Sequence, residues 1–285
     1  MATLKVKDNM IVSYEDYGSG PVVMLLHSSP GNSKMWQRVG DRLSDRFRII
    51  APDLPGYGKT TPQDPSISPN LSYTAALIEA LISVIGPPLV LAGHSYGGVV
   101  ALNGALANPK IAKGVALFEP VAIPILSAIG ENDAYAYAKA FFDGYISGFE
   151  AGDNQAVRKM IDFWFGPGTF EKMPPSLKDY LFTNTALNIL DVRATFRTRY
   201  SIESLRNLNV PLLVVYGKRS PEVTLKIASS IATHTKRGSL VGLENATHAL
   251  TTTHVEEVTA LIAEFANKCA SPDAPEDASS GAPMN

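Results

Sequence analysis

The chain has 285 residues, of which 45% are hydrophobic and 18% are charged, and its formal net charge is −2. This composition provides for a sizeable buried core, and the near balance of charges excludes the basic surface typical of proteins that bind nucleic acid or anionic membranes. A single cysteine, Cys269, excludes an internal disulfide, and no Cys/His spacing predicts a metal site.

The first eight residues lack the apolar segment of a signal peptide, and no apolar run is long enough to cross a bilayer. We therefore expect a cytoplasmic protein that acts on a small molecule, with no nucleic-acid or membrane partner. The sequence leaves the oligomeric state open.

Short apolar runs alternate with helix-like segments along most of the chain. Strands are predicted at 4–17 (an edge hairpin), 21–27, 47–51, 89–92, 114–119, 210–216 and 238–243. Helices are predicted at 36–43, 72–85, 99–107, 217–232 and 253–268. Thr253 and Glu256 predict a capping box for the last helix. Continuous apolar strands that alternate with helices indicate an α/β protein with a mostly parallel, doubly wound sheet.

One region interrupts this alternation. Residues 122–206 read as helical and contain a cluster of aromatic residues. We therefore predict a core of residues 1–121 and 207–269 with a helical insertion at 122–206. The final segment, 270–285, is rich in Pro, Ala and Ser and is predicted to be disordered.

The segment from Gly93 to Gly97 fits G-x-S-x-G, the pattern of a nucleophile elbow. The pattern alone is weak, but an apolar strand precedes it and an Ala- and Leu-rich helix follows. A strand that turns into a helix within one residue forces Ser95 into a strained backbone, and side chains at Gly93 or Gly97 would collide across the turn. We predict that Ser95 is a nucleophile at the positive end of the helix.

A serine hydroxyl is barely ionised at neutral pH, so it needs a base, and the chain offers five histidines. Four of them occupy a loop start, the elbow itself, the end of a surface-like helix and the start of the last helix: His27, His94, His234 and His254. The fifth, His248, stands in a loop directly after the last strand. We predict His248 as the base.

Together these motifs resemble the α/β-hydrolase fold family over about residues 3 to 268. The matching segments are the elbow, the loop His27–Gly31, the segment Ala51–Gly58 and the late His248. The resemblance implies that the insertion at 122–206 is a helical cap. It also implies a serine hydrolase that needs no cofactor, with its base at His248.

The resemblance leaves the identity of the acid open. The family's most frequent acid follows the strand at 210–216, and the matching position here is Ser220, which carries no charge. One branch of the family places the acid after the preceding core strand, where Glu119 lies 24 residues past the nucleophile. We predict Glu119, which would be partly desolvated and would need His248 as a partner. The alternatives are Glu222 and a pair without an acid.

Two backbone N–H groups are expected to stabilise a developing oxyanion, that of Tyr96 at the helix start and, by its position in the family, that of Ser29. Ser28 stands where the family usually has glycine, and we expect its hydroxyl to contact the substrate. Trp164 and Phe165 are the aromatic residues of the insertion that we predict to face the nucleophile and bind the substrate.

Other polar residues receive a structural interpretation. Asp53, which follows a strand in Pro-Asp-Leu-Pro-Gly, is expected to cap local amides. Three arginines of the insertion offer contacts for an anionic substrate, although a solvated helix face is the simpler expectation: Arg193, Arg197 and Arg199.

The predicted function is hydrolysis of a small to medium carboxylic ester through an acyl-enzyme. A serine nucleophile argues against epoxide opening and halide displacement, which relatives carry out with an aspartate. One alternative is another reaction on the same residues, either carbon–carbon bond hydrolysis, which calls for an arginine in the cap, or cofactor-free perhydrolysis. The alternative outside catalysis is a ligand receptor.

Overall fold

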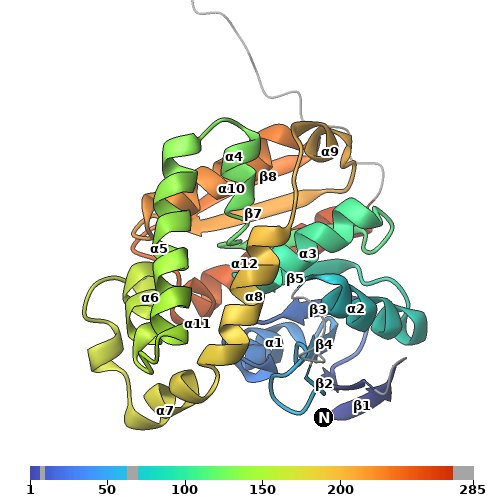
Figure 1. Ribbon diagram of the computed structural model, residues 1–285. Coiled ribbons are helices and arrows are strands. Elements are labelled where there is room, and N and C mark those ends of the chain that lie inside the picture. The colour runs from blue at the N-terminus through green and yellow to red at the C-terminus, as the bar shows by residue number, and fades with distance from the viewer. Residues whose placement is uncertain (7–9, 63–69, 272–285) are drawn as a thin grey trace, which may run out of the picture.

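The computed structural model describes residues 1–6, 10–62 and 70–271. Within these ranges, one sheet has the strand order β1-β2-β4-β3-β5-β6-β7-β8 (Figure 1). Strands β3 to β8 pair in parallel, whereas β2 runs antiparallel to both β1 and β4. The strands are β1 (Ala2–Lys5), β2 (Ile11–Tyr17), β3 (Val22–Leu26), β4 (Arg48–Pro52), β5 (Val90–His94), β6 (Gly114–Phe118), β7 (Leu212–Gly217) and β8 (Gly238–Leu243). The predicted mostly parallel α/β sheet is confirmed.

Helices cover both faces of this sheet. One face packs against α1 and α12, and the other packs against α2, α3 and α10. The helices of the core are η2 (Ser33–Trp36), α1 (Gln37–Leu43), α2 (Ser72–Ile85), α3 (Tyr96–Ala107), α10 (Glu222–His234), α11 (Leu250–Thr253) and α12 (Val255–Ala270).

Strand β6 shows why helices must pack on both faces of the sheet. Val115 and Leu117 belong to one hydrophobic cluster, and Ala116 and Phe118 belong to the other. All four side chains are fully buried. Successive side chains of a strand point to opposite faces, so a strand without polar positions is stable only between two packed layers.

Six α-helices and one 3₁₀ helix lie between β6 and β7 in the described chain. They are α4 (Pro124–Ala128), α5 (Asn132–Glu150), α6 (Ala156–Phe165), η3 (Phe170–Lys172), α7 (Pro175–Thr183), α8 (Thr185–Arg197) and α9 (Ile202–Asn207). Figure 1 shows α5, α6, α7 and α8 as a group beside the sheet, whereas α4 lies next to α10. Helices α4 and α9 pack on α10, and α8 packs on α3. The insertion is thus anchored on core helices, and its boundaries at 122 and 206 stay a prediction.

The expected start of the last helix is wrong. Residues Leu250–Thr253 form the separate helix α11, and α12 begins at Val255 with His254 at its N-cap and no side-chain cap. The Thr253 hydroxyl donates instead to the carbonyl oxygen of Ala249, 3.1 Å away. The predicted capping box therefore does not form.

The predicted tail at 270–285 is largely untested. Ala270 is the last residue of α12, and residues 272–285 lie outside the described residues. Within the described ranges, no helix combines the length and the apolar character needed to cross a bilayer.

Candidate active site

Ser95 connects the end of β5 to the start of α3, and its backbone has φ 55° and ψ −116°. This left-handed conformation is rare for a residue with a side chain, so the predicted strain is present. A Cβ atom on Gly93 would lie 2.2 Å from the carbonyl oxygen of Gly97, and one on Gly97 would lie 2.4 Å from that of Leu26. Only glycine fits at either position, as the sequence predicts.

The structure brings Ser95, His248 and Glu119 together, and we call them the Ser95–His248–Glu119 array. His248 Nε2 lies 3.0 Å from Ser95 Oγ, and His248 Nδ1 lies 2.9 Å from Glu119 Oε2. The three residues follow β5, β8 and β6, so they meet where the carboxyl ends of parallel strands converge. All three side chains are buried, and Glu119 is 0% exposed.

Glu119 is fixed on both of its carboxylate oxygens. Its Oε1 accepts a 2.5 Å hydrogen bond from the backbone N–H of Gly217, while Oε2 faces the imidazole. Its backbone φ is 50°, and its N–H donates to the carbonyl oxygen of Val215. Glu222, the alternative acid, begins α10 with an exposed side chain 3.6 Å from Lys226. The carboxylate beside the imidazole is therefore that of Glu119.

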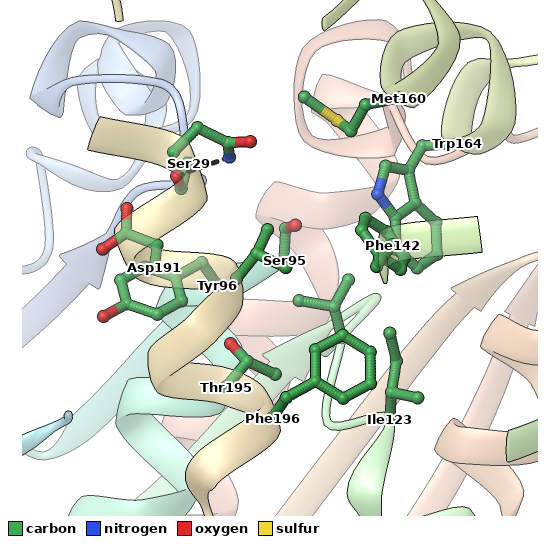
Figure 2. Close-up of a pocket in the computed structure, with 13 residues that line it drawn as sticks. Ser29, Ser95, Tyr96, Ile123, Phe142, Met160, Trp164, Asp191, Thr195 and Phe196 are labelled. Atoms are coloured by element: carbon green, nitrogen blue, oxygen red, sulfur yellow. Dashed lines mark hydrogen bonds between the residues drawn. The ribbon is translucent and has the colours of Figure 1, made fainter. Parts of the chain in front are cut away.

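Two aromatic residues of α6 surround the imidazole of His248. The Trp164 ring stacks on it at 4.9 Å between centroids and 20° between planes, and the Phe165 ring meets it edge-on at 5.3 Å. Figure 2 shows Trp164 on the same cavity as Ser95. Both aromatic residues thus lie where the sequence predicts substrate contacts.

His94 has a positioning role that the sequence reasoning missed. Its Nε2 donates a 2.8 Å hydrogen bond to the backbone carbonyl of His248, and the two rings lie 5.0 Å apart. Burial holds the pKa of His94 well below its usual value, and the nearby His248 lowers it further. A neutral ring has one N–H, and here that N–H holds the loop that carries the base. The signal in the sequence was only the position of His94 next to the nucleophile.

The loop after β3 is held by buried polar contacts. His27 Nδ1 donates to the carbonyl of Ser28 at 2.7 Å, and its Nε2 accepts the N–H of Leu54 at 2.8 Å. Burial lowers the pKa of His27 to about 4, so the ring stays neutral and can accept. Asp53 accepts the backbone N–H groups of Ser33 and Lys59, which is the structural role expected of it.

Ser29 and Tyr96, the predicted oxyanion donors, both line the cavity at Ser95. In the described part of the chain, neither backbone N–H donates a hydrogen bond to another residue. The Ser29 hydroxyl pairs with the Tyr57 hydroxyl at 2.8 Å. Ser28, the other serine of this loop, lines the larger neighbouring cavity with its N–H and hydroxyl near a methionine sulfur.

Ser95 lines two cavities. The larger has about 470 Å³ and is lined by His248 and Phe165 as well as Ser95. The smaller has about 30 Å³ and lies between α8 and the side chains of Trp164 and Phe142 (Figure 2). None of the three arginines of the insertion lines either cavity, and Arg193 pairs with Glu150 instead.

Asp191, which the sequence reasoning missed, is a second buried carboxyl group at this site. It lies on α8, lines the smaller cavity, and accepts a 2.7 Å hydrogen bond from the Tyr57 hydroxyl. Burial raises its pKa to about 7, although hydrogen bonds from Ser29, Tyr57 and Tyr96 act in the opposite direction. The available signal was a polar face of one helix, since Asn188, Asp191 and Thr195 recur at helical spacing.

Known proteins resemble this chain over most of its length. The chain is 22% identical over 263 residues to (E)-2-((N-methylformamido)methylene)succinate hydrolase of Acinetobacter baylyi, which covers 90% of this chain and 94% of that protein. A thermophilic esterase from Thermogutta terrifontis superposes with a TM-score of 0.75 at 22% identity, over 95% of this chain and 99% of that one. The esterase EaEST of Exiguobacterium antarcticum gives a TM-score of 0.74 at 19% identity, over 93% and 98%.

A family model for the alpha/beta hydrolase family matches residues 23–261, which include the elbow, the loop after β3 and the late histidine. The match spans both parts of the core and the insertion between them. The chain therefore belongs to the alpha/beta hydrolase family and is a hydrolase, as its motifs predict.

Proposed function

We propose that this hydrolase cleaves carboxylic esters through an acyl-enzyme formed on Ser95. The observation that carries the proposal is the continuous hydrogen-bonded Ser95–His248–Glu119 array at a strained elbow, with Ser95 lining two cavities. A buried hydroxyl that contacts an imidazole, which in turn contacts a carboxylate, is the arrangement used for acyl transfer.

In the proposed mechanism, Ser95 Oγ attacks the ester carbonyl carbon while its proton passes to His248 Nε2. Glu119 lies on Nδ1 and balances the charge that forms on the imidazole. The developing oxyanion accepts hydrogen bonds from the N–H groups of Ser29 and Tyr96. The imidazolium then protonates the leaving alcohol, and a water molecule, deprotonated by His248, releases the acid.

Among the alternatives on the same residues, carbon–carbon bond hydrolysis fits the similarity to (E)-2-((N-methylformamido)methylene)succinate hydrolase, but the cavity linings favour it less. Carbon–carbon bond hydrolysis would call for an arginine in the insertion near the site, and no described arginine lines either cavity. Perhydrolysis uses the same acyl-enzyme with hydrogen peroxide in place of water, so a parallel assay with added hydrogen peroxide as the acceptor tests it. A ligand receptor would not need the Ser95–His248–Glu119 array.

The test uses the purified chain with p-nitrophenyl acetate and a fluorophosphonate probe. We expect ester turnover and covalent labelling, both abolished in Ser95→Ala, with a loss on the order of 10⁶-fold in kcat. Ser83→Ala is the control, because this hydroxyl is exposed on α2 and bonds only the carbonyl of Ala80. Absence of both turnover and labelling in the native chain would favour the receptor.

A further inference from the structure

The two cavities at Ser95 differ in which catalytic group they contain. Both are lined by Ser29, Ser95 and Trp164, but only the larger is lined by His248. On the proposed function, on which this inference rests, His248 Nε2 gives a proton to the leaving alcohol. The alcohol must therefore lie on the side of the imidazole, which is the side of the larger cavity. The smaller cavity is left for the acyl group.

The smaller cavity limits the length of that acyl group. Its volume of about 30 Å³ is far below the roughly 470 Å³ of the neighbouring cavity. Only a few atoms beyond the carbonyl carbon fit without displacing its walls. The larger cavity, at about 470 Å³, has room for an aryl or branched alcohol.

One wall of the smaller cavity is apolar and the other is polar. Figure 2 shows Trp164, Phe142 and Met160 facing the α8 side, where Asp191 and Thr195 lie. The apolar wall offers no hydrogen bond to an acyl chain. The polar wall offers the Thr195 hydroxyl and the Asp191 carboxyl group, which already accepts from the Tyr57 hydroxyl but has lone pairs for a further donor.

Thr195 supplies the strongest evidence for a ligand on the polar wall. The residue is 3% exposed and lines the cavity, and in the described chain its hydroxyl has no hydrogen bond and is not among the fully buried polar atoms. A hydroxyl that opens into a cavity without a protein partner is free to hydrogen-bond a bound ligand. Asn188, on the same face, is already used, since it donates to Ser29 Oγ and accepts from the Tyr145 hydroxyl.

We propose that the smaller cavity binds a short hydroxyacyl group, whose hydroxyl donates to the Asp191 carboxyl group and accepts from the Thr195 hydroxyl. The substrate class is then an ester of a two- or three-carbon hydroxy acid with a bulky alcohol. A site built to hydrogen-bond a substrate hydroxyl discriminates against analogues that lack it, because its own polar groups are then left unpaired.

Phenyl esters that share one leaving group test this proposal. Glycolate and propionate are a nearly isosteric pair, with a hydroxyl in the place of a methyl group, and hexanoate tests length. The kcat/KM of each ester is divided by its rate of hydrolysis by hydroxide, which removes intrinsic reactivity. We expect the native enzyme to prefer glycolate over propionate, and both over hexanoate, by at least about tenfold.

Substitutions in the polar wall test whether it causes the preference for the glycolate ester. Thr195→Val keeps the shape of the side chain and removes its hydroxyl. We expect the ratio of kcat/KM for the glycolate ester to that for the propionate ester to fall about three- to tenfold. Asp191→Asn should lower the same ratio, and Thr195→Val keeps the test valid should the asparagine variant fold poorly. Thr183→Val, at an exposed position on α7, is the control that should leave the ratio unchanged.

Two results would overturn the proposal while leaving the ester hydrolase intact. If the ratio of kcat/KM for the glycolate ester to that for the propionate ester is unchanged in Thr195→Val, the Thr195 hydroxyl does not contact the acyl group. If the hexanoate ester is turned over faster than the propionate ester, the acyl group does not lie in the smaller cavity. Failure of the proposed function looks different, since no phenyl ester would be hydrolysed and no fluorophosphonate label would form on the native chain.

Discussion

The two sides of the active site are held in place in different ways. On the sheet side, Ser95 and Glu119 sit in positive-φ backbone conformations at the ends of neighbouring strands, and backbone hydrogen bonds fix both. On the insertion side, Trp164 and Asp191 reach the site as side chains of helices, of which α6 packs on α5 and α8 packs on the core helix α3. The difference teaches that the reactive atoms are placed by backbone geometry, whereas the shape and polarity of the cavity depend on helix packing.

The largest effect is expected on the sheet side. Glu119→Gln removes the charge that balances the imidazole and reverses the hydrogen bond on one oxygen, so kcat should fall about 10³- to 10⁴-fold. Glu222→Gln, which changes an exposed carboxylate, should leave kcat near the native value. Steady-state kinetics with phenyl acetate measure both variants. A large loss in Glu222→Gln alone would move the acid away from Glu119.

On the insertion side, Asp191 should make stability depend on pH. Its pKa rises from 3.8 to about 7 on folding, so the folded state binds the extra proton between these values. Stability is therefore full below about pH 4 and falls as pH rises toward 7, by roughly 4 kcal/mol at most.

Urea unfolding of the native chain and of Asp191→Asn between pH 4.5 and 8 checks this dependence. The neutral asparagine should remove that part of the slope. The depressed pKa of His27 contributes in the opposite sense, with stability lost as pH falls from 6.5 toward about 4, but it is common to both proteins and cancels in the difference. Asp179→Asn, an exposed change on α7, is the control. Equal slopes for the native chain and Asp191→Asn would contradict the prediction.

Two glycine-to-alanine changes contrast the two sides directly. In Gly97→Ala the new methyl group meets the backbone carbonyls of Leu26 and His27 at 2.4 and 2.6 Å, so α3 must move off β3, at a cost of about 3 kcal/mol. Gly148, inside α5 of the insertion, has nothing within 4 Å of the new atom, and Gly148→Ala should stabilise by about 0.5–1 kcal/mol. Thermal unfolding shows whether each variant is more or less stable than the native chain. A Gly97→Ala variant that is more stable would refute the packing argument.

The smallest effect on kcat should come from the stacked ring. Trp164→Leu keeps an apolar side chain but removes the π face that lies on His248, where a protonated imidazole is stabilised by about 1 kcal/mol. We expect kcat to fall about fivefold to tenfold in Trp164→Leu. Phe182→Leu, whose ring packs on Phe170 away from the site, is the control. If both variants behave alike, the effect is one of packing in the insertion and not of contact with the imidazole.

The sheet side was accessible from the sequence because its signals are local. An apolar strand, a glycine-flanked serine and an Ala-rich helix follow one another within residues 89 to 107. Glu119 could be singled out because one branch of the family that the chain resembles places its acid after this strand, and parallel strands bring their carboxyl ends to one edge. These inferences need no knowledge of how helices pack.

The insertion side was less accessible for the same physical reason. Helical spacing shows that Asp191 and Thr195 share a face of α8, but only its packing on α3 turns that face toward Ser95. His94 was not predicted to act at the site, because its side chain and that of the adjacent Ser95 diverge in a sharp turn. Its hydrogen bond to the backbone of His248 joins residues 154 positions apart. The capping box failed because Thr253 already belongs to α11.

The presence of His248 in the larger cavity alone has a kinetic consequence. On the proposed mechanism, departure of the alcohol clears the compartment beside the imidazole while the acyl group stays behind in the other one. The incoming water therefore follows the path of the departed alcohol and meets the same ring nitrogen. Any added alcohol of suitable size competes with water along that path, so the enzyme should also exchange one alcohol for another, and faster as the acceptor fills the vacated space.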